Sequence, residues 1–351
     1  MARSAAHSSP IPAHAFLCLY DVSWTLHRLQ WPSLSHRPYS LLCSSRHRAN
    51  RAKQLLDFLH IDVTGPEAEN TFDEKAGAIR KCSWDLLEAA DREEDAILLD
   101  NEGRRVTEER GSGIVINLTF DTATYRVILY GPAPSQPSSS AASSQQTATL
   151  PLLLTKTPIP LTKRLFTFLL DTFEIRISPV KLHQSLLHST FESYIEIICR
   201  HTTSMSLERR RAFLTSALKD IKISLSFSAP ITTHLRTIDA DLPPETVCNL
   251  IEASVSSKTS FMQVLAVHLE HHTGMQLPLP ADGDGESLEV EHLVRISKIV
   301  CHAIALSGDG RFKIVGKALS AAEVENLGNV IREANEMVLT SLLAEAVKAR
   351  G

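Results

Sequence analysis

The sequence has 351 residues, of which 43% are hydrophobic and 22% are charged, and its formal net charge is −4. This composition is ordinary for a globular protein and excludes a strongly basic chain that would attract nucleic acid through its overall charge. No apolar run reaches the roughly 18–20 residues of a membrane-spanning helix. The polar N-terminus lacks the apolar core of a signal peptide, so we expect a protein of the nucleus or cytosol, with no membrane partner.

The N-terminal part of the chain predicts an α+β lobe over residues 15–131, after a disordered stretch at residues 1–14. Alternating apolar residues between Phe16 and Leu29 indicate one strand or two short ones. Residues 113–131 alternate apolar and polar side chains on both sides of a polar turn, which predicts an antiparallel hairpin.

Two helices are expected between these strands. Residues 46–61 are basic and then apolar, which predicts a short helix whose cations are either solvated or available to phosphates. Within the acidic stretch at residues 65–110, residues 83–90 have a helical pattern. Neither segment carries a motif that indicates catalysis.

Residues 132–149 are rich in Ser, Pro, Gln and Ala, a composition that cannot bury enough apolar surface to become ordered. We therefore predict a disordered linker here, followed by a C-terminal, partner-binding α+β lobe over residues 150–351. The elements expected in this lobe are a strand at 150–154, helices at 161–172 and 184–199, a half-buried strand at 221–229, a helix that begins with Pro243-Pro244-Glu245, a helix at 261–273 and a strand at 275–279.

The lobe is expected to close on a long antiparallel hairpin over residues 293–319. In its first arm Val294, Ile296 and Val300 alternate with Arg295, Ser297 and Ile299; Phe312 and Ile314 alternate with Arg311, Lys313 and Val315 in the second arm. A Gly-Asp-Gly turn joins the arms. Apolar residues at three- and four-residue steps after Ser320 predict a C-terminal helix that covers one face of the hairpin. The predicted fold class is α+β, with curved antiparallel sheets and helices packed on one face.

Metal binding has one weak candidate. His268 and His272 lie four residues apart on an expected helix, a spacing that can chelate zinc. Glu270 stands between them, not beside the first histidine as in an HExxH protease, and no third ligand is evident. The six cysteines are scattered without a CxxC pair, which predicts free thiols in a reducing compartment. We expect no cofactor and no metal.

Four collinear segments resemble the centromere protein L family of kinetochore subunits. They are Trp24-Thr25-Leu26 with the following Arg28-Leu29, the run from Leu150-Pro151-Leu152 to Ser178-Pro179, the strand that ends at Pro230, and the segment from Leu293-Val294-Arg295-Ile296-Ser297 to Leu319. Residues 35–110 and the linker carry no resemblance.

This resemblance implies a non-catalytic, nuclear subunit of the inner kinetochore at the centromere. It implies a heterodimer with a centromere protein N-like subunit, contacts with other inner-kinetochore subunits, and contact with centromeric nucleosomal DNA through the complex. The partner surface would then comprise Arg311, Phe312, Ile314, Val315 and Leu319, on a strand that could accept a neighbouring strand by edge pairing. Candidate contacts to the DNA backbone are Arg295, Lys313 and Lys317.

Two alternatives and one question stay open at this point. The chain could be a metal-dependent hydrolase that uses His268 and His272, or a plain α+β adaptor that does not touch DNA. Formation of a homodimer is also an open question, since the sequence does not decide the oligomeric state.

Overall fold

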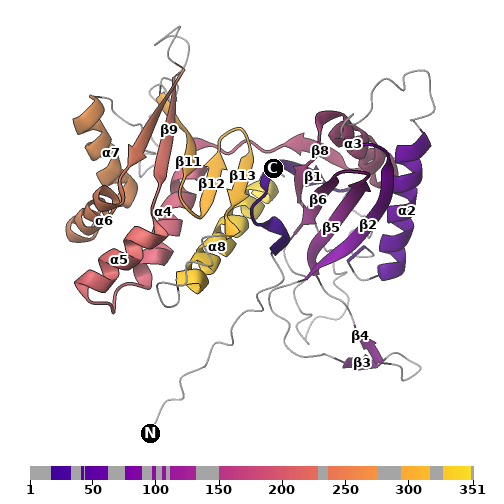
Figure 1. Ribbon diagram of the computed structural model, residues 1–351, viewed down its shortest axis with the longest axis horizontal. Helices are drawn as coiled ribbons and strands as arrows, with labels where there is room; N and C mark the ends of the chain where they lie inside the picture. Colours follow the sequence, from indigo (N-terminus) through magenta and orange to yellow (C-terminus); the bar gives the residue numbers. More distant parts are fainter. Residues whose placement is uncertain are drawn as a thin grey trace. The chain divides into compact units, whose positions relative to one another are not determined.

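The computed structural model of the protein describes residues 17–32, 41–42, 44–61, 76–88, 97–99, 105–107, 111–131, 150–227, 236–274, 294–316 and 327–348. As predicted, the fold is α+β, with an open antiparallel sheet of 11 strands and a C-terminal helix (Figure 1). Hydrogen bonds join its strands in the order β10-β9-β11-β12-β13-β1-β7-β6-β5-β2, with β8 beside β1. The disordered segments predicted at 1–14 and 132–149 and the strand predicted at 275–279 lie outside the described residues.

The chain forms two compact units. The first unit consists of Met1–Leu19 and His27–Ser178, and the second of Tyr20–Leu26 and Pro179–Gly351. The strand β1 (Ser23–Gln30) therefore contributes its first residues to the second unit and its last residues to the first. The lobe boundaries expected from the sequence stay a prediction.

The first unit contains most of the N-terminal elements. They are η1 (Leu17–Leu19), α2 (Ser45–Ile61), β2 (Ile79–Glu88), β3 (Ile97–Leu99), β4 (Arg105–Thr107), β5 (Gly111–Phe120), β6 (Thr124–Tyr130), β7 (Leu152–Lys156) and α3 (Ile159–Phe173), followed by β8 (Arg176–Pro179). The predicted hairpin at 113–131 is confirmed, because β5 pairs with β6 from Gly113↔Tyr130 to Thr119↔Thr124. Leu55 and Leu165, from α2 and α3, are fully buried in one core with Ile116 of the sheet.

The helix predicted at residues 83–90 is wrong, because residues 79–88 form β2. The last residues of this segment are consecutive good helix formers, which produced the helical pattern. Trp84 and its neighbours instead alternate between the two faces of the strand. Pairing with β5 and burial of Trp84, which is 4% exposed, override that local preference.

The second unit combines a meander of strands with a layer of helices. Its elements are α4 (Gln184–Arg200), α5 (Leu207–Ala217), β9 (Ile221–Phe227), β10 (Thr237–Leu242), α6 (Pro244–Ser257), α7 (Phe261–Thr273), β11 (Val294–Val300), β12 (Ile304–Ser307), β13 (Arg311–Ile314) and α8 (Leu327–Lys348). Helix α7 has the predicted bounds and ends at Gly274, whose φ is 69°. No helix in the described ranges is both long and apolar enough to cross a membrane.

The closing hairpin is more divided than the sequence suggests. The turn before Arg311 is confirmed, since β12 and β13 pair from Ser307↔Arg311 to Ile304↔Ile314. The first arm, however, is split into β11 and β12 by a tight turn in which the Cys301 N–H donates to the Ile304 carbonyl oxygen at 2.8 Å. The expected two-armed hairpin is thus a three-stranded meander.

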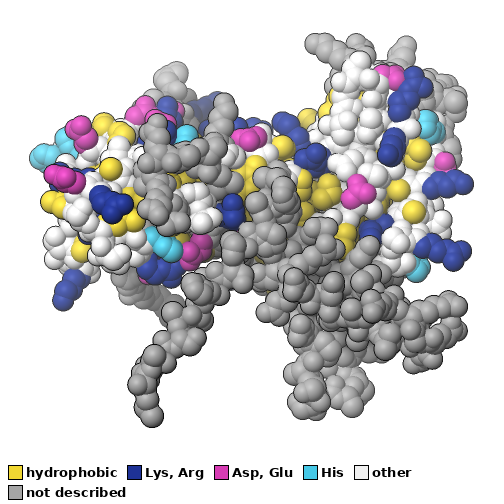
Figure 2. Space-filling view, turned by 60° about the horizontal axis from the view of Figure 1, so that its bottom comes forward, with side chains coloured by type: hydrophobic (Ala, Val, Ile, Leu, Met, Phe, Trp, Pro, Cys, Tyr) yellow, Lys and Arg dark blue, Asp and Glu magenta, His cyan; other side chains and the backbone are white. Residues whose placement is uncertain are grey.

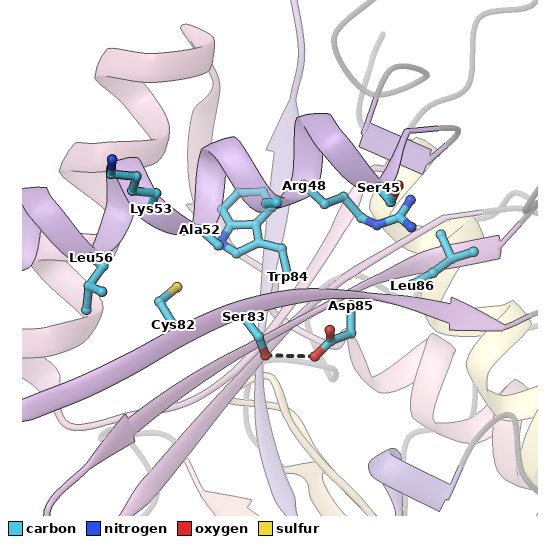
Figure 3. Close-up of a pocket in the computed structure, with 11 residues that line it drawn as sticks. Ser45, Arg48, Ala52, Lys53, Leu56, Cys82, Ser83, Trp84, Asp85 and Leu86 are labelled. Atoms are coloured by element: carbon cyan, nitrogen blue, oxygen red, sulfur yellow. Dashed lines mark hydrogen bonds between the residues drawn. The ribbon is translucent and has the colours of Figure 1, made fainter.

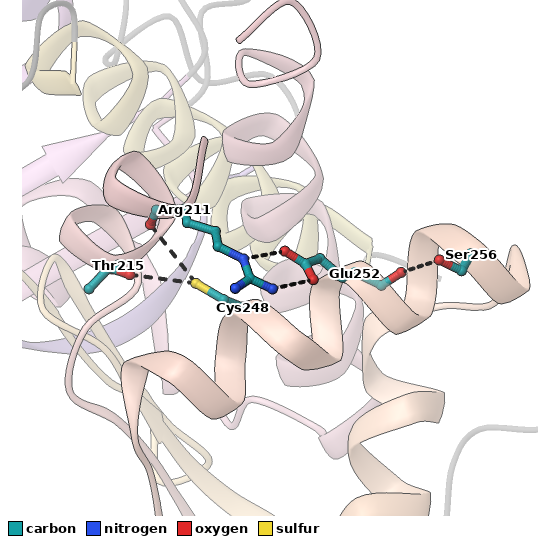
Figure 4. Close-up of polar contacts among 5 residues, drawn as sticks. All are labelled: Arg211, Thr215, Cys248, Glu252 and Ser256. Atoms are coloured by element: carbon teal, nitrogen blue, oxygen red, sulfur yellow. Dashed lines mark hydrogen bonds and ion pairs between the residues drawn. The ribbon is translucent and has the colours of Figure 1, made fainter. Parts of the chain in front are cut away.

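The helices of the second unit are joined by polar side-chain contacts. Glu192 of α4 accepts hydrogen bonds from the first two N–H groups of α7, those of Phe261 and Met262, at 2.7 and 3.0 Å. Arg211 of α5 donates two hydrogen bonds to Glu252 of α6, at 2.8 and 2.7 Å (Figure 4). These contacts fix α5, α6 and α7 within the helix layer.

Candidate nucleic-acid and partner interface

The strands of the second unit present two unlike faces. Residues that lie directly opposite each other on neighbouring antiparallel strands point to the same side of the sheet. On one side the pairs Ile223↔Ile299 and Leu306↔Phe312 are at most 1% exposed. Helix α4 packs against β11 and α8 packs against α4, so this is the face that the helices cover (Figure 1).

The opposite face is polar, and none of the described helices covers it. One row of directly paired residues runs across it as Asp239, Ser224, Lys298, Ser307, Arg311 and Thr25. A second row runs as Asp241, Lys222, Val300, Ala305, Lys313 and Ser23. Arg295, opposite Ser226, lies on the same face. We call this surface the open face; it carries cations on β9, β11 and β13 and carboxylates on β10.

Lys298 reaches the open face because β11 contains a bulge. Strict alternation would place residue 298 on the same side as Ile296, but the register with β9 shifts between Ile296 and Lys298. As a result Ile299 is fully buried and Lys298 is exposed beside Arg295. The apolar residues at 296 and 299, three positions apart, are the sequence signal that could have revealed this bulge.

The cations of the open face differ in how they are neutralised. Lys222 forms an ion pair with Asp241 at 3.0 Å, and the hydrogen bond to this carboxylate raises the pKa of the lysine. Arg311 pairs with Asp309 at 3.2 Å, and Arg295 donates from Nε to Ser226 Oγ at 2.9 Å. Lys298 and Lys313 form no ion pair with any described residue. The positive charge that is least compensated therefore lies on β11 and β13.

The structure separates the predicted partner residues into two groups. Phe312 and Ile314 are 1% and 0% exposed, so they belong to the core below the sheet. Arg311 is exposed and Val315 is half-buried. Lys317 and Leu319 lie outside the described residues.

The expectation that this strand accepts a partner by edge pairing is wrong for β13. One of its edges is occupied by β12 and the other by β1, through the pairs Ser23↔Lys313, Trp24↔Phe312 and Thr25↔Arg311. A strand needs an unpaired edge before another strand can be added to it. Which residues contact a partner stays a prediction.

A comparison with protein families identifies the family of this chain. The family model described as CENP-L, centromere protein L, matches residues 18–347, which is nearly the whole chain. The chain belongs to the centromere protein L family. Membership gives it a role at the centromere and kinetochore, which are nuclear, as a member of a structural family with inner-kinetochore partners. The comparison with curated proteins gives no significant match.

The histidine pair of this centromere protein L family member lies on α7. The ring centroids of His268 and His272 are 4.4 Å apart, and burial together with the charges of His272 and His271 lowers the pKa of His268. No group of three His, Cys, Asp or Glu side chains that could hold a metal ion occurs among the described residues. The metal-hydrolase alternative thus gains no third ligand here.

The described cysteines of the chain are free thiols, as predicted, and burial keeps several of them protonated. Burial raises the pKa of Cys82 to about 12 and that of Cys199 to about 11. A protonated thiol is a poor nucleophile and a poor metal ligand. These residues therefore have the chemistry of core side chains.

Proposed function

We propose that this chain is a non-catalytic scaffold subunit of the inner kinetochore. It pairs with a centromere protein N-like subunit and helps to anchor the kinetochore to centromeric chromatin during chromosome segregation. The observation that carries the chromatin part is the open face, where cations from separate strands lie on one side of the sheet. The helices cover the other side.

The proposed DNA contacts are Arg295, Lys298 and Lys313. Neighbouring strands are about 4.8 Å apart and residues rise about 3.4 Å along a strand. Lys298 on β11 and Lys313 on β13 are separated by β12 and lie in neighbouring rows, two residues apart, so their backbones are roughly 12 Å apart. Cations at this spacing can follow a phosphate backbone without reading base edges. Ser226 adds a hydroxyl group beside Arg295, whereas Ser224 and Ser307 already donate to Asp239 and to the Ser297 carbonyl oxygen. We therefore expect contact that depends on salt and not on sequence.

A charge reversal tests the DNA contact. In the complex with the centromere protein N-like partner, the double variant Arg295→Glu, Lys313→Glu should bind duplex DNA more weakly. The slope of log affinity against log salt should become shallower by roughly 2, since each lost phosphate contact contributes about 0.9. The matched control is Arg209→Glu, Lys258→Glu, which makes the same change of charge at exposed positions of the helix layer. Unchanged affinity and slope in the first variant would favour the plain adaptor instead.

The proposed partner surface lies at the end of β13, around Arg311 and Val315, whose side chains are accessible. Since both edges of β13 are occupied, this contact is made through side chains. A partner that adds a strand to the second unit would instead use β10, which among the described strands pairs only with β9. Phe312 and Ile314 serve the surface indirectly, because they anchor β13 in the core.

Co-expression with a centromere protein N-like subunit tests the pairing. Size-exclusion chromatography with light scattering should show a one-to-one complex, and the chain alone, measured in parallel, will show whether it forms a homodimer. The variant Arg311→Glu, Val315→Glu should lose the complex and keep its far-UV circular dichroism. A chain that stays alone at every concentration, although it is folded, contradicts the pairing.

A further inference from the structure

The first unit contains an open groove between a helix and a strand, with a volume of about 630 Å³. Its walls come from α2 and from β2 (Figure 3). The helix contributes Ser45, Arg48, Ala49, Ala52, Lys53 and Leu56, and the strand contributes Cys82, Ser83, Trp84, Asp85 and Leu86. The size is within the range of sites that hold a small ligand or a few residues of a peptide.

The strand wall of the groove is a sheet edge. Among the described strands β2 pairs only with β5, from Ile79↔Phe120 to Glu88↔Gly111. An edge strand offers unpaired backbone N–H and C=O groups to another chain. A helix that lies alongside such an edge makes a groove in which an extended peptide can pair with the strand and pack against the helix.

The inner part of the groove combines apolar surface with a buried donor. Leu56, Cys82 and Leu86 are half-buried, and Trp84 is 4% exposed. The indole Nε1–H of Trp84 is buried without a nitrogen or oxygen acceptor among the described residues, and the Cys82 sulfur beside it is only a weak acceptor. A buried donor without a good acceptor costs free energy, which a carbonyl or carboxylate oxygen in the groove would recover. The high pKa of the Cys82 thiol, about 12, argues against a nucleophilic role for this site.

The rim of the groove is basic. Lys53 of the lining is exposed, and so are Arg46 and Lys81, which are next in sequence to the lining residues Ser45 and Cys82; α2 has no acidic residue in its first turn. The view in Figure 2 shows dark blue Lys and Arg side chains over the part of the first unit where Figure 1 places α2. Asp85 is the carboxylate of the lining, but it accepts hydrogen bonds from Ser83 at 2.7 Å and from Asn117 at 3.0 Å. The charge that complements this rim is negative.

We propose that the groove between α2 and β2 binds an extended acidic peptide segment of another protein, which adds as a strand along β2. One apolar side chain of the segment lies against Leu56 and Trp84. The acidic side chains two positions before and after it point to the same side of the added strand and face Arg46 and Lys53. This site belongs to the first unit and is independent of the open face and of the partner surface proposed above.

Fluorescence anisotropy on the full chain tests this proposal. The probe is a fluorescein-labelled peptide with the core Glu-Ser-Val-Ser-Glu, which places Val and both Glu on one side of a strand, and the control probe has Lys in place of Glu. We expect the acidic peptide to bind and the basic one not to bind. Ala49→Trp, which places a large side chain in the groove from an exposed helix position, should weaken binding by at least about tenfold. Asn50→Trp, at the neighbouring exposed position outside the lining, should leave it unchanged.

Two further samples keep the interpretation specific. Lys53→Glu, at an exposed position, should weaken the acidic peptide without an effect on the fold. A peptide with the same sequence and N-methylated backbone amides should not bind, because it cannot complete the ladder with β2. The proposal is overturned if the acidic peptide fails to bind, or if Ala49→Trp and Asn50→Trp have the same effect on its binding. It is also overturned if a single-stranded oligonucleotide binds the groove and the acidic peptide does not displace it.

Discussion

Phe312 and Arg311 are neighbours in the chain with opposite surroundings. Phe312 is 1% exposed and pairs with Trp24 and Leu306 on the helix-covered face, whereas Arg311 points to the open face. Phe312→Ala should lower the free energy of unfolding by about 3–5 kcal/mol, because it leaves a cavity in the core. Arg311→Ala should change it by less than about 0.5 kcal/mol. Urea denaturation of both variants measures the difference, and equal losses would contradict this assignment of faces.

His27 makes the stability of the first unit depend on pH. Its Nε2 lies 3.2 Å from Thr155 Oγ1, and burial lowers its pKa to about 4 from an ordinary value of 6.5. Between these pH values the unfolded chain binds a proton that the folded chain does not. Stability should therefore be unaffected by this group above pH 6.5 and fall as the pH drops toward 4, by up to about 3 kcal/mol.

The variant His27→Gln tests this dependence, because glutamine keeps polar atoms near Thr155 but does not titrate. Unfolding by urea should be measured for both proteins at intervals from pH 7 to pH 4. We expect a shallower loss of stability in the variant. Parallel curves would show that other groups cause the acid sensitivity.

The face of the sheet on which a residue lies was predictable where polar and apolar residues alternate regularly, and not where a bulge interrupts the alternation. Arg311 and Lys313 share a face, as their spacing indicated. Lys298 was missed, because the bulge after Ile296 moves it to the face of Arg295. Burial of Phe312 and Ile314 could have been inferred from their apolar side chains. The pairing of β1 with β13 could not, because it joins residues almost 290 positions apart and no local sequence pattern indicates it.

At the scale of elements, the N-terminus of α7 depends on a side chain of another helix. Both carboxylate oxygens of Glu192 accept N–H groups of α7, and Ser260 with Gln263 forms a capping box at the same end. Glu192→Ala should destabilise the protein by about 1–3 kcal/mol. Hydrogen exchange should accelerate at residues 261–263 in particular. Glu196→Ala, at an exposed position one turn further along α4, is the control and should have little effect.

The turn between β12 and β13 requires glycine at position 310. Gly310 has a φ of 82°, and an added Cβ would collide with the carbonyl oxygen of Val180. Gly310→Ala should therefore cost more than the roughly 1 kcal/mol of a left-handed backbone alone. Gly274→Ala is the matched control, because its φ is 69° but nothing lies within 4 Å of the added atom. Similar thermal unfolding of the two variants would contradict the collision.

Elements with a single strong period were predictable, and those that depend on a distant partner were not. The bounds of α7 follow from its apolar stripe and from Gly274, and the β5–β6 hairpin follows from its alternation. Strand β2 was mistaken for a helix in part, since its final residues favour helix and only pairing with β5 holds them extended. The groove beside β2 could not be foreseen without that strand.

At the scale of the whole molecule, membership in the centromere protein L family agrees with a scaffold built from one open sheet. In the second unit, all the helices described are connected to one another on the covered side. This arrangement leaves a polar surface for contacts with other molecules, and the stability of the unit does not depend on it. Variants at Lys298 or Lys313 should therefore change binding and leave the unfolding free energy within about 0.5 kcal/mol.

The division of β1 between the units has a consequence for biosynthesis. Tyr20–Leu26 leave the ribosome early, but their partner β13 is made almost 290 residues later. At about 5–20 residues per second, this strand segment waits roughly 15–60 seconds before it can pair. A fragment of the chain that starts at Pro179 would never receive it, and β13 would then present an open edge that recruits other chains. Such a fragment should aggregate, and a synthetic peptide of residues 20–26 supplied in trans should keep it in solution.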